Sequence, residues 1–213
     1  MFSGHCGSFD HNGDNIVYFN QSSEYWSHPY PYNGDDSDLR SSGCGIFSMC
    51  VVIRRLSGIT VAPEELADYA LIHGGRDDTG TDRPSLLQGL VDGGRDVEYG
   101  FIYNGDGLVN DHEKLWSVLS CGGCAMCNLR TGHIVACVDS RLYKDERQML
   151  VVDSACETYD VRIKDKVKEV IPETLTRKKT VNANGLTVGA HEGYGAYWVP
   201  VDSARDFNLI WKR

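Results

Sequence analysis

The spacing of apolar residues changes near residue 124, and this change limits the folds open to the chain. Before it, apolar residues recur every three or four positions in segments such as 46–56 and 84–91, which is typical of amphipathic helices. After it, short apolar runs such as 124–129 and 133–138 lie between turn-forming residues, which indicates strands. Helices that precede strands predict an α+β fold, in which the helices pack on an antiparallel sheet.

The expected elements are bounded by capping residues and glycines. The four expected helices begin near Cys44, Pro63, Pro84 and Asp111, and each ends before a glycine. The expected strands are 16–19, 101–103, 124–129, 133–138, 148–152, 195–200 and 207–211. Residues 1–15 are rich in Gly, His, Asn and Asp, so we expect a loose N-terminal arm followed by a single domain over 16–213.

Cys44 lies at the N-terminal end of the first expected helix, between Gly43 and Gly45. The partial positive charge and free N–H groups of a helix N-terminus favour a thiolate over a thiol. Glycines on both sides are expected to let a substrate backbone come close. The alternative is a small buried residue at a helix start, and this stretch alone does not decide between the two.

Three further polar residues are candidates to act together with a thiolate at Cys44. His133 follows a glycine and begins an expected strand, so its ring is expected to emerge at the sheet edge and stabilise the thiolate. Asp153 ends the next strand, where it would accept a hydrogen bond from the imidazole. Gln21 would donate its amide to an oxyanion beside the Cys44 N–H.

Each of these residues has an ordinary structural alternative. A histidine at a strand start is often a surface or satisfied core residue, and His112 or His191 is the next candidate base. An aspartate after a strand often opens a turn, and Asp139 is the second candidate for the orienting role. Gln21 would otherwise be an exposed residue at a strand end.

The order Gln, Cys, His, Asp is that of the papain-like cysteine peptidases. Within them, the chain resembles the bacteriocin-processing, or double-glycine, peptidase-like family. Five short segments carry this resemblance, at residues 18–26, 41–70, 80–90, 132–138 and 151–154.

The resemblance implies a papain-like fold, in which the nucleophile helix packs on a C-terminal antiparallel sheet. It implies a cysteine peptidase that hydrolyses peptide or isopeptide bonds through an acyl-enzyme, without a cofactor. Cys44 would be the nucleophile, His133 the base and then the acid, Asp153 the orienting residue and Gln21 part of the oxyanion hole. A cell-wall peptide hydrolase of the same fold, bacterial or from a phage, is the alternative within this class.

The expected specificity is for small residues on the acyl side of the bond. Processing members of the family cut after paired glycines. The closing strand 196–198 is also expected to place Trp198 near the His133 strand, where it would fill the space that a bulky residue needs. We therefore expect Gly or Ala at that position.

Charge and hydropathy exclude several other classes. A net charge of −9 argues against a nucleic-acid partner and leaves a peptide or protein substrate as the expected one. The sequence has no apolar run of about 18 residues, so we expect no membrane span. It shows no signal-peptide pattern, so the expected location is the cytoplasm, or the outside of the cell if this is the mature part of an exported protein.

Cys121, Cys124 and Cys127 form two successive CxxC steps, which raise the possibility of a zinc or iron–sulfur site. The possible fourth ligands, Cys137 and Cys156, lie in or after strands and lack the usual spacing. We therefore expect no structural metal. A metal-thiolate module or a non-catalytic peptide-binding domain is the alternative from a different class of function.

Overall fold

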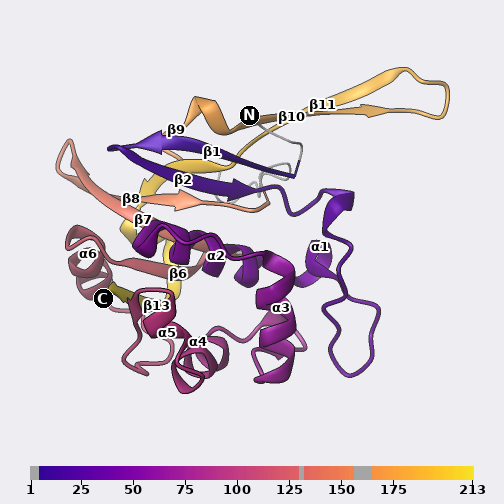
Figure 1. Ribbon diagram of the computed structural model, residues 1–213. Coiled ribbons are helices and arrows are strands. Elements are labelled where there is room, and N and C mark those ends of the chain that lie inside the picture. The colour runs from indigo at the N-terminus through magenta and orange to yellow at the C-terminus, as the bar shows by residue number, and fades with distance from the viewer. Residues whose placement is uncertain (1–4, 130–131, 156–164) are drawn as a thin grey trace.

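An antiparallel sheet of seven strands forms the centre of the protein in the computed structural model, which describes residues 5–129, 132–155 and 165–213 (Figure 1). In spatial order its strands are β5 (Phe101–Ile102), β13 (Ala204–Lys212), β6 (Cys124–Leu129), β7 (Ile134–Tyr143), β8 (Glu146–Val152), β12 (Ala196–Pro200) and β9 (Glu169–Val170). Three hairpins stand apart from this sheet: β1 (Cys6–His11) with β2 (Asp14–Phe19), β3 (Arg76–Asp77) with β4 (Gly80–Thr81), and β10 (Leu175–Val181) with β11 (Thr187–Tyr194).

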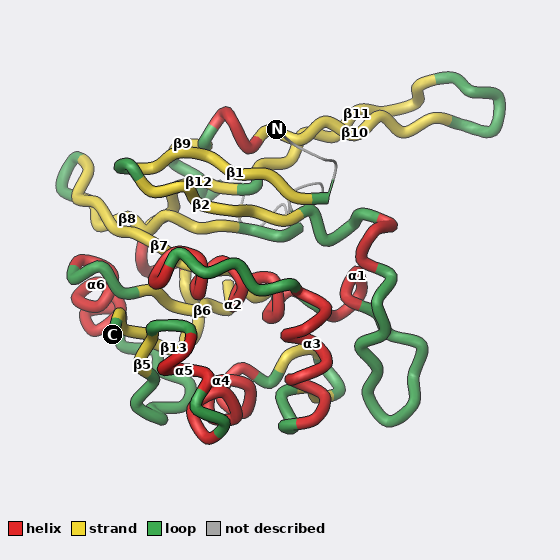
Figure 2. The backbone as a smooth tube through the Cα atoms, viewed as in Figure 1, coloured by secondary structure: helices red, strands yellow, loops and turns green. Residues whose placement is uncertain are grey.

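Helices occupy about half of the chain between β2 and β6. They are α1 (Leu39–Ser42), α2 (Cys44–Ser57), α3 (Pro63–Ile72), α4 (Arg83–Asp92), α5 (Arg95–Glu98) and α6 (His112–Ser120). Single turns of 3₁₀ helix occur at η1 (Glu24–Trp26), η2 (Pro172–Thr174) and η3 (Val201–Ser203). Figure 2 shows α3, α4 and α5 on one side of α2 and the β1–β2 hairpin on the other. No helix in the described residues is long and apolar enough to cross a membrane.

The prediction of an α+β fold with an antiparallel sheet is confirmed. The four expected helices correspond to α2, α3, α4 and α6, and Gly58 ends α2 in the left-handed conformation that glycine adopts readily. Strands β6, β7 and β8 follow one another as antiparallel neighbours, as their short connections predicted. The short helices α1 and α5 were not expected.

The predicted loose arm over residues 1–15 is wrong for the part that the structure describes. Cys6–His11 forms β1 and pairs with β2, so that Phe9 lies opposite Ile16 and both are buried. The turn between them is Asn12-Gly13, and both residues have positive φ values, of 53° and 83°. Asn-Gly is the turn that best matches the twist of a hairpin, so this signal was present in the sequence.

The sheet separates two apolar cores, because alternate residues of each strand point to opposite faces. In β6, Cys124 and Met126 face the core beneath α2, whereas Cys127 faces the core beneath α6. Helix α2 is almost entirely buried between β7, β6 and the β1–β2 hairpin. The first residue of this helix is therefore held firmly relative to the ends of the strands.

Arg83 joins the start of α4 to the edge of the sheet. Its side chain is only 5% exposed, and it donates to the Met126 carbonyl at 2.8 Å and to the Asp206 carboxylate. A buried guanidinium is stable only when it is paired in this way. Arg205 binds the same Asp206 carboxylate at 2.7 Å but is 55% exposed.

We expect Arg83→Met to lower the free energy of unfolding by about 2–3 kcal/mol, because it removes buried hydrogen bonds that involve a charged group. Arg205→Met, which removes an exposed pair with the same carboxylate, should cost under about 1 kcal/mol. Urea unfolding followed by circular dichroism measures both values. Equal losses in the two variants would contradict the assignment of Arg83 as the structural member of the pair.

Candidate active site

Cys44 is the first residue of α2 and lines a cleft of about 340 Å³. Cys44 is half-buried as a residue, and as the first residue of the helix it has no acceptor for its N–H within its own helix. The glycines beside it have an internal role. A β-carbon at Gly43 would lie 2.5 Å from the Leu39 carbonyl oxygen, and one at Gly45 would lie 2.5 Å from Thr81 Cβ. The flanking glycines are thus required by packing within the protein, and their role in letting a substrate backbone come close stays a prediction.

His133 and Asp153 meet at the same edge of the sheet. His133 directly precedes β7, and Asp153 directly follows β8, its antiparallel neighbour. The two side chains join through His133 Nε2 and Asp153 Oδ1, which are 2.7 Å apart. Cys44 hydrogen-bonds to the His133 ring, and since Nε2 is used by Asp153, Nδ1 is the nitrogen left for the thiol.

The charges of the three groups support one another. Burial of the Cys44 thiol by itself raises its pKa. The hydrogen bond and the charge of His133, together with the N–H groups of Ile134 and Gly45, outweigh this effect and lower the pKa. Removal from water also opposes charge on His133, yet Asp153 and the Cys44 thiolate raise the imidazole pKa well above its usual range. The result favours a thiolate–imidazolium pair.

The Asp153 carboxylate has further partners that the sequence did not predict. Burial would raise its pKa, but His133, the Tyr197 hydroxyl and the Ala155 N–H lower it. The Ala155 N–H donates to Oδ1 at 2.8 Å, and the Tyr197 hydroxyl donates to Oδ2 at 2.5 Å. Tyr197 lies in β12, and no motif in the sequence connects it to Asp153.

Gln21 is buried beside the residue that follows Asp153. Its backbone N–H donates to the Ser154 carbonyl at 2.8 Å, and its side-chain oxygen accepts from the Ser154 hydroxyl at 2.9 Å. Its Nε2 donates one hydrogen to the Arg40 carbonyl at 2.9 Å, just before α2. The second N–H of Nε2 is the one that would donate a hydrogen bond to an oxyanion.

Ser48 ties the helix to the strand that follows His133. Its hydroxyl lies 2.8 Å from the Cys44 carbonyl oxygen and 3.1 Å from the Ile134 carbonyl oxygen. One turn of α2 is therefore connected directly to the start of β7. This contact holds the first turn of α2, which carries Cys44, beside the residue that follows His133.

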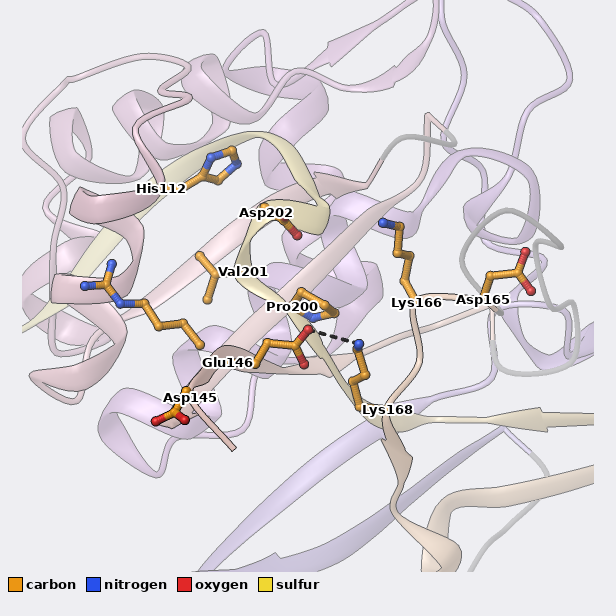
Figure 3. A pocket seen from close by; sticks show the side chains of 10 residues that line it. His112, Asp145, Glu146, Asp165, Lys166, Lys168, Pro200, Val201 and Asp202 are labelled. Atoms are coloured by element: carbon orange, nitrogen blue, oxygen red, sulfur yellow. Dashed lines mark ion pairs between the residues drawn. The ribbon is translucent and has the colours of Figure 1, made fainter. Parts of the chain in front are cut away.

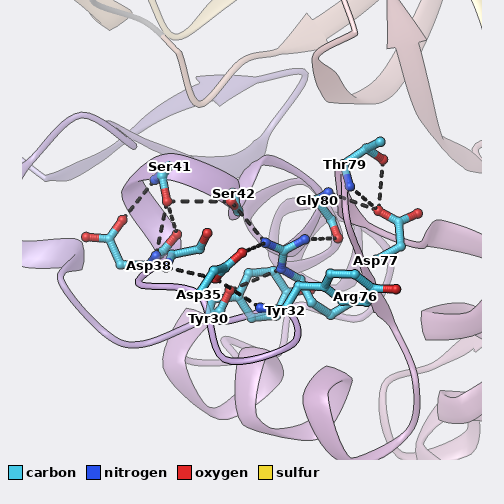
Figure 4. A network of polar contacts seen from close by, with 11 residues as sticks. Tyr30, Tyr32, Asp35, Asp38, Ser41, Ser42, Arg76, Asp77, Thr79 and Gly80 are labelled. Atoms are coloured by element: carbon cyan, nitrogen blue, oxygen red, sulfur yellow. Dashed lines mark hydrogen bonds and ion pairs between the residues drawn. The ribbon is translucent and has the colours of Figure 1, made fainter.

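A network around Arg76 builds the loops next to Cys44 (Figure 4). The guanidinium donates to the carbonyls of Tyr30 and Gly80, each at 3.1 Å. It also donates to the Ser42 hydroxyl at 3.3 Å and lies 3.8 Å from the Asp35 carboxylate. The loop that precedes α1 and the β3–β4 hairpin are thereby fixed to the segment that enters α2.

The cleft at Cys44 has a lining of mixed polarity. Its other lining residues are Asp77, Thr79, Thr81, Asp82, Arg83, Pro84, Leu108, Asn128, Gly132, Ile134, Arg205 and Asp206. Trp198 does not line it; its ring packs against the Arg141 guanidinium at 4.2 Å. The expectation that Trp198 narrows the cleft is therefore wrong, because this residue faces the core on the other side of β12 from Tyr197.

The alternative residues lie elsewhere. Asp139 bonds to His11 at 2.7 Å. The Nε2 atom of His112 lies 2.8 Å from the Ala204 carbonyl oxygen, so this imidazole bonds outside the triad. His112 instead lines a second cavity of about 660 Å³, whose wall carries side chains of both charges (Figure 3). The side chain of His191 lies outside the described part.

The three cysteines of the CxxCxxC segment diverge. Cys121 is exposed at the end of α6, Cys124 and Cys127 lie on opposite faces of β6, and Cys127 contacts Cys137 at 3.0 Å between the sulfur atoms. Cys156 falls outside the described residues. Within the described part of the chain, no group of three or more His, Cys, Asp or Glu side chains is placed to hold a metal ion. The absence of a structural metal stays a prediction.

No family model, curated protein or solved structure matches this chain. A function for it therefore has to be inferred from its own residues.

We expect iodoacetamide at pH 6 to modify Cys44 before the other described cysteines, because a lowered pKa keeps thiolate present at a pH where ordinary thiols are protonated. Burial raises the pKa of the Cys124 thiol to about 12 and that of Cys50 further still. His133→Ala should slow modification of Cys44 by roughly tenfold or more at this pH, since each pKa unit changes the thiolate fraction tenfold. Peptide mapping by mass spectrometry identifies the labelled residue. Faster labelling of exposed Cys121 would contradict the assignment.

Proposed function

We propose that this protein is a papain-like cysteine hydrolase that cleaves peptide or isopeptide bonds. The observation that carries the proposal is the hydrogen-bonded series from Cys44 through His133 to Asp153, with the thiol opening onto a cleft. A nucleophile, a base bonded to it and a third group that orients the base are the features by which such catalysis is recognised, whatever the fold.

The arrangement of elements agrees with the papain-like part of the proposal. The thiol lies at the start of a buried helix, and that helix packs on an antiparallel sheet. The histidine and the aspartate come from adjacent strands of the same sheet. Gln21, from a segment that precedes the helix in sequence, lies beside Ser154 and the Arg40 carbonyl.

Acylation follows from these positions. The Cys44 thiolate attacks the carbonyl carbon, and the negative charge moves to the carbonyl oxygen. The Cys44 N–H and the second hydrogen of Gln21 Nε2 donate to this oxyanion. His133 then gives its Nδ1 proton to the departing amine, the C–N bond breaks, and a thioester remains on Cys44.

Deacylation reverses the role of the imidazole. Neutral His133 removes a proton from water as the water attacks the thioester, and the carboxylic acid leaves as the C–S bond breaks. Asp153 stays ionised throughout, because its pKa is lowered by its partners, and it holds the tautomer of His133 that presents Nδ1 to the sulfur.

Peptide hydrolysis tests the proposal. Cys44→Ala and His133→Ala should each lower kcat/KM by at least about 10³-fold, and the double variant should be little worse, because the residues act as one unit. Asp153→Asn should cost less, because an amide oxygen still accepts from Nε2. The substrates are a mixed peptide library, isopeptides and cell-wall peptides, with product amines measured.

Cys121→Ala and His112→Ala serve as matched controls. Cys121 is exposed at the end of α6, and His112 lines the cavity of about 660 Å³ rather than the cleft at Cys44. Both should keep full activity. Unchanged hydrolysis by His133→Ala would overturn the assignment. Binding of peptides without cleavage of any bond would instead favour a non-catalytic peptide-binding domain.

Gln21→Ala should lower kcat by about 10²-fold or more, which is the usual loss when an oxyanion donor is removed. The rate of Cys44 alkylation should change little, because alkylation forms no oxyanion. This comparison separates the donor role from a general disturbance of the site. Parallel falls in hydrolysis and alkylation would assign Gln21 a structural role only, through its bonds to Ser154 and Arg40. Gln88→Ala, on the exposed face of α4, is the control.

A further inference from the structure

Tyr197 reaches the triad from the opposite core. It lies in β12 opposite Val151 of β8, and its side chain is 2% exposed. The backbone continues this pairing past the strand end, where the Asp153 N–H donates to the Gly195 carbonyl at 2.8 Å. The start of β12 is therefore fixed beside Asp153, and the Tyr197 hydroxyl donates to Asp153 Oδ2 at 2.5 Å.

The two carboxylate oxygens of Asp153 have different partners. Oδ1 accepts from His133 Nε2 at 2.7 Å and from the Ala155 N–H at 2.8 Å, whereas Oδ2 accepts from Tyr197. A carboxylate that is held at one oxygen only can turn about its Cβ–Cγ bond. A short O–H···O⁻ bond to the second oxygen prevents this turn, because charge-assisted hydrogen bonds are the strong ones.

We infer that Tyr197 is a positioning residue of the triad, which acts through Asp153 to hold the His133 imidazole toward Cys44. This inference rests on the proposed function. Tyr197 is not among the residues that line the cleft, and its hydroxyl bonds to the Asp153 carboxylate, so the effect we assign to it passes through that carboxylate.

The titratable side chains that bond to the Asp153 carboxylate in the described part of the chain come from two elements. They are His133, next to β7, and Tyr197, from β12. Cys44 from α2 faces the imidazole on its other side. The segment after β2 adds the uncharged Gln21, which bonds to Ser154.

The direction of the pH effect follows from this environment. The phenol hydrogen bond stabilises the ionised carboxylate and so lowers the Asp153 pKa. Without it, Asp153 takes up a proton at a higher pH during acidification, and the neutral carboxyl holds the His133 imidazolium toward Cys44 less firmly. The hydrogen bond from His133 that lowers the Cys44 pKa is then weakened, so the thiolate is lost at a higher pH as well.

The test is the pH dependence of Cys44 alkylation, which needs no substrate. In Tyr197→Phe, the acid limb of the rate profile should move up by about half a pH unit or more, which lowers the rate about threefold at a pH below the limb. Tyr69→Phe is the matched control, because it removes a similar phenol bond, 2.8 Å from the Gly89 carbonyl, far from the triad. Its acid limb should stay where it is in the wild type.

A second substitution guards against loss of fold in the phenylalanine variant. Replacement of Tyr197 by 3-fluorotyrosine keeps the shape and makes the phenol a stronger donor, so the acid limb should move to lower pH. In an Asp153→Asn background, Tyr197→Phe should cause no further shift, because the group through which it acts is neutral.

The outcomes distinguish the inference from the proposed function. The wild type can show an acid limb at low pH that neither Tyr197→Phe nor 3-fluorotyrosine shifts. That result overturns the inference alone. An equal shift in Tyr69→Phe also overturns it, since the effect would then be a general loss of stability. If Cys44 of the wild type shows no reactive thiolate at a pH below the pKa of an ordinary thiol, the proposed function is overturned, and the inference with it.

Discussion

The packing of α2 on β6 and β7 is the contact on which the rest of the site depends. It places the first residue of the helix next to the start of β7, and the Ser48 hydroxyl bridges the Cys44 and Ile134 carbonyl groups across this contact. Gly45 permits the neighbouring contact of α2 with β4, because Thr81 of that strand occupies the space that a side chain would need. A shift of α2 along the sheet would separate the thiol from His133 even if every other residue stayed in place.

Charges at this edge of the sheet are stable because each one has a partner. Asp153 accepts three hydrogen bonds, from His133, Ala155 and Tyr197, and His133 lies between an acid on one side and a thiol on the other. An isolated carboxylate in the same place would be protonated or would destabilise the fold. The contacts that favour a thiolate–imidazolium pair are therefore the ones that allow these charges to be buried.

The elements themselves were largely predictable from local patterns. Periodicity and capping residues located α2, α3, α4 and α6 within a few residues, and alternation located the meander of β6, β7 and β8. The order of those three strands then placed His133 near Asp153, because the end of one antiparallel strand lies beside the start of its neighbour. The β1–β2 hairpin was missed although Asn12-Gly13 signalled it, since polar residues hid the alternation around Phe9.

What the sequence by itself determined is the set of local elements and the proximity of groups on neighbouring strands, because both depend on short separations along the chain. Only the tertiary structure decided which distant side chains complete the site. Tyr197 meets Asp153 from 44 positions away, and Trp198, its neighbour in β12, points to the opposite core. A shift of one residue along a strand moves a side chain to the opposite face of the sheet. No local pattern shows which residues of β12 face the triad.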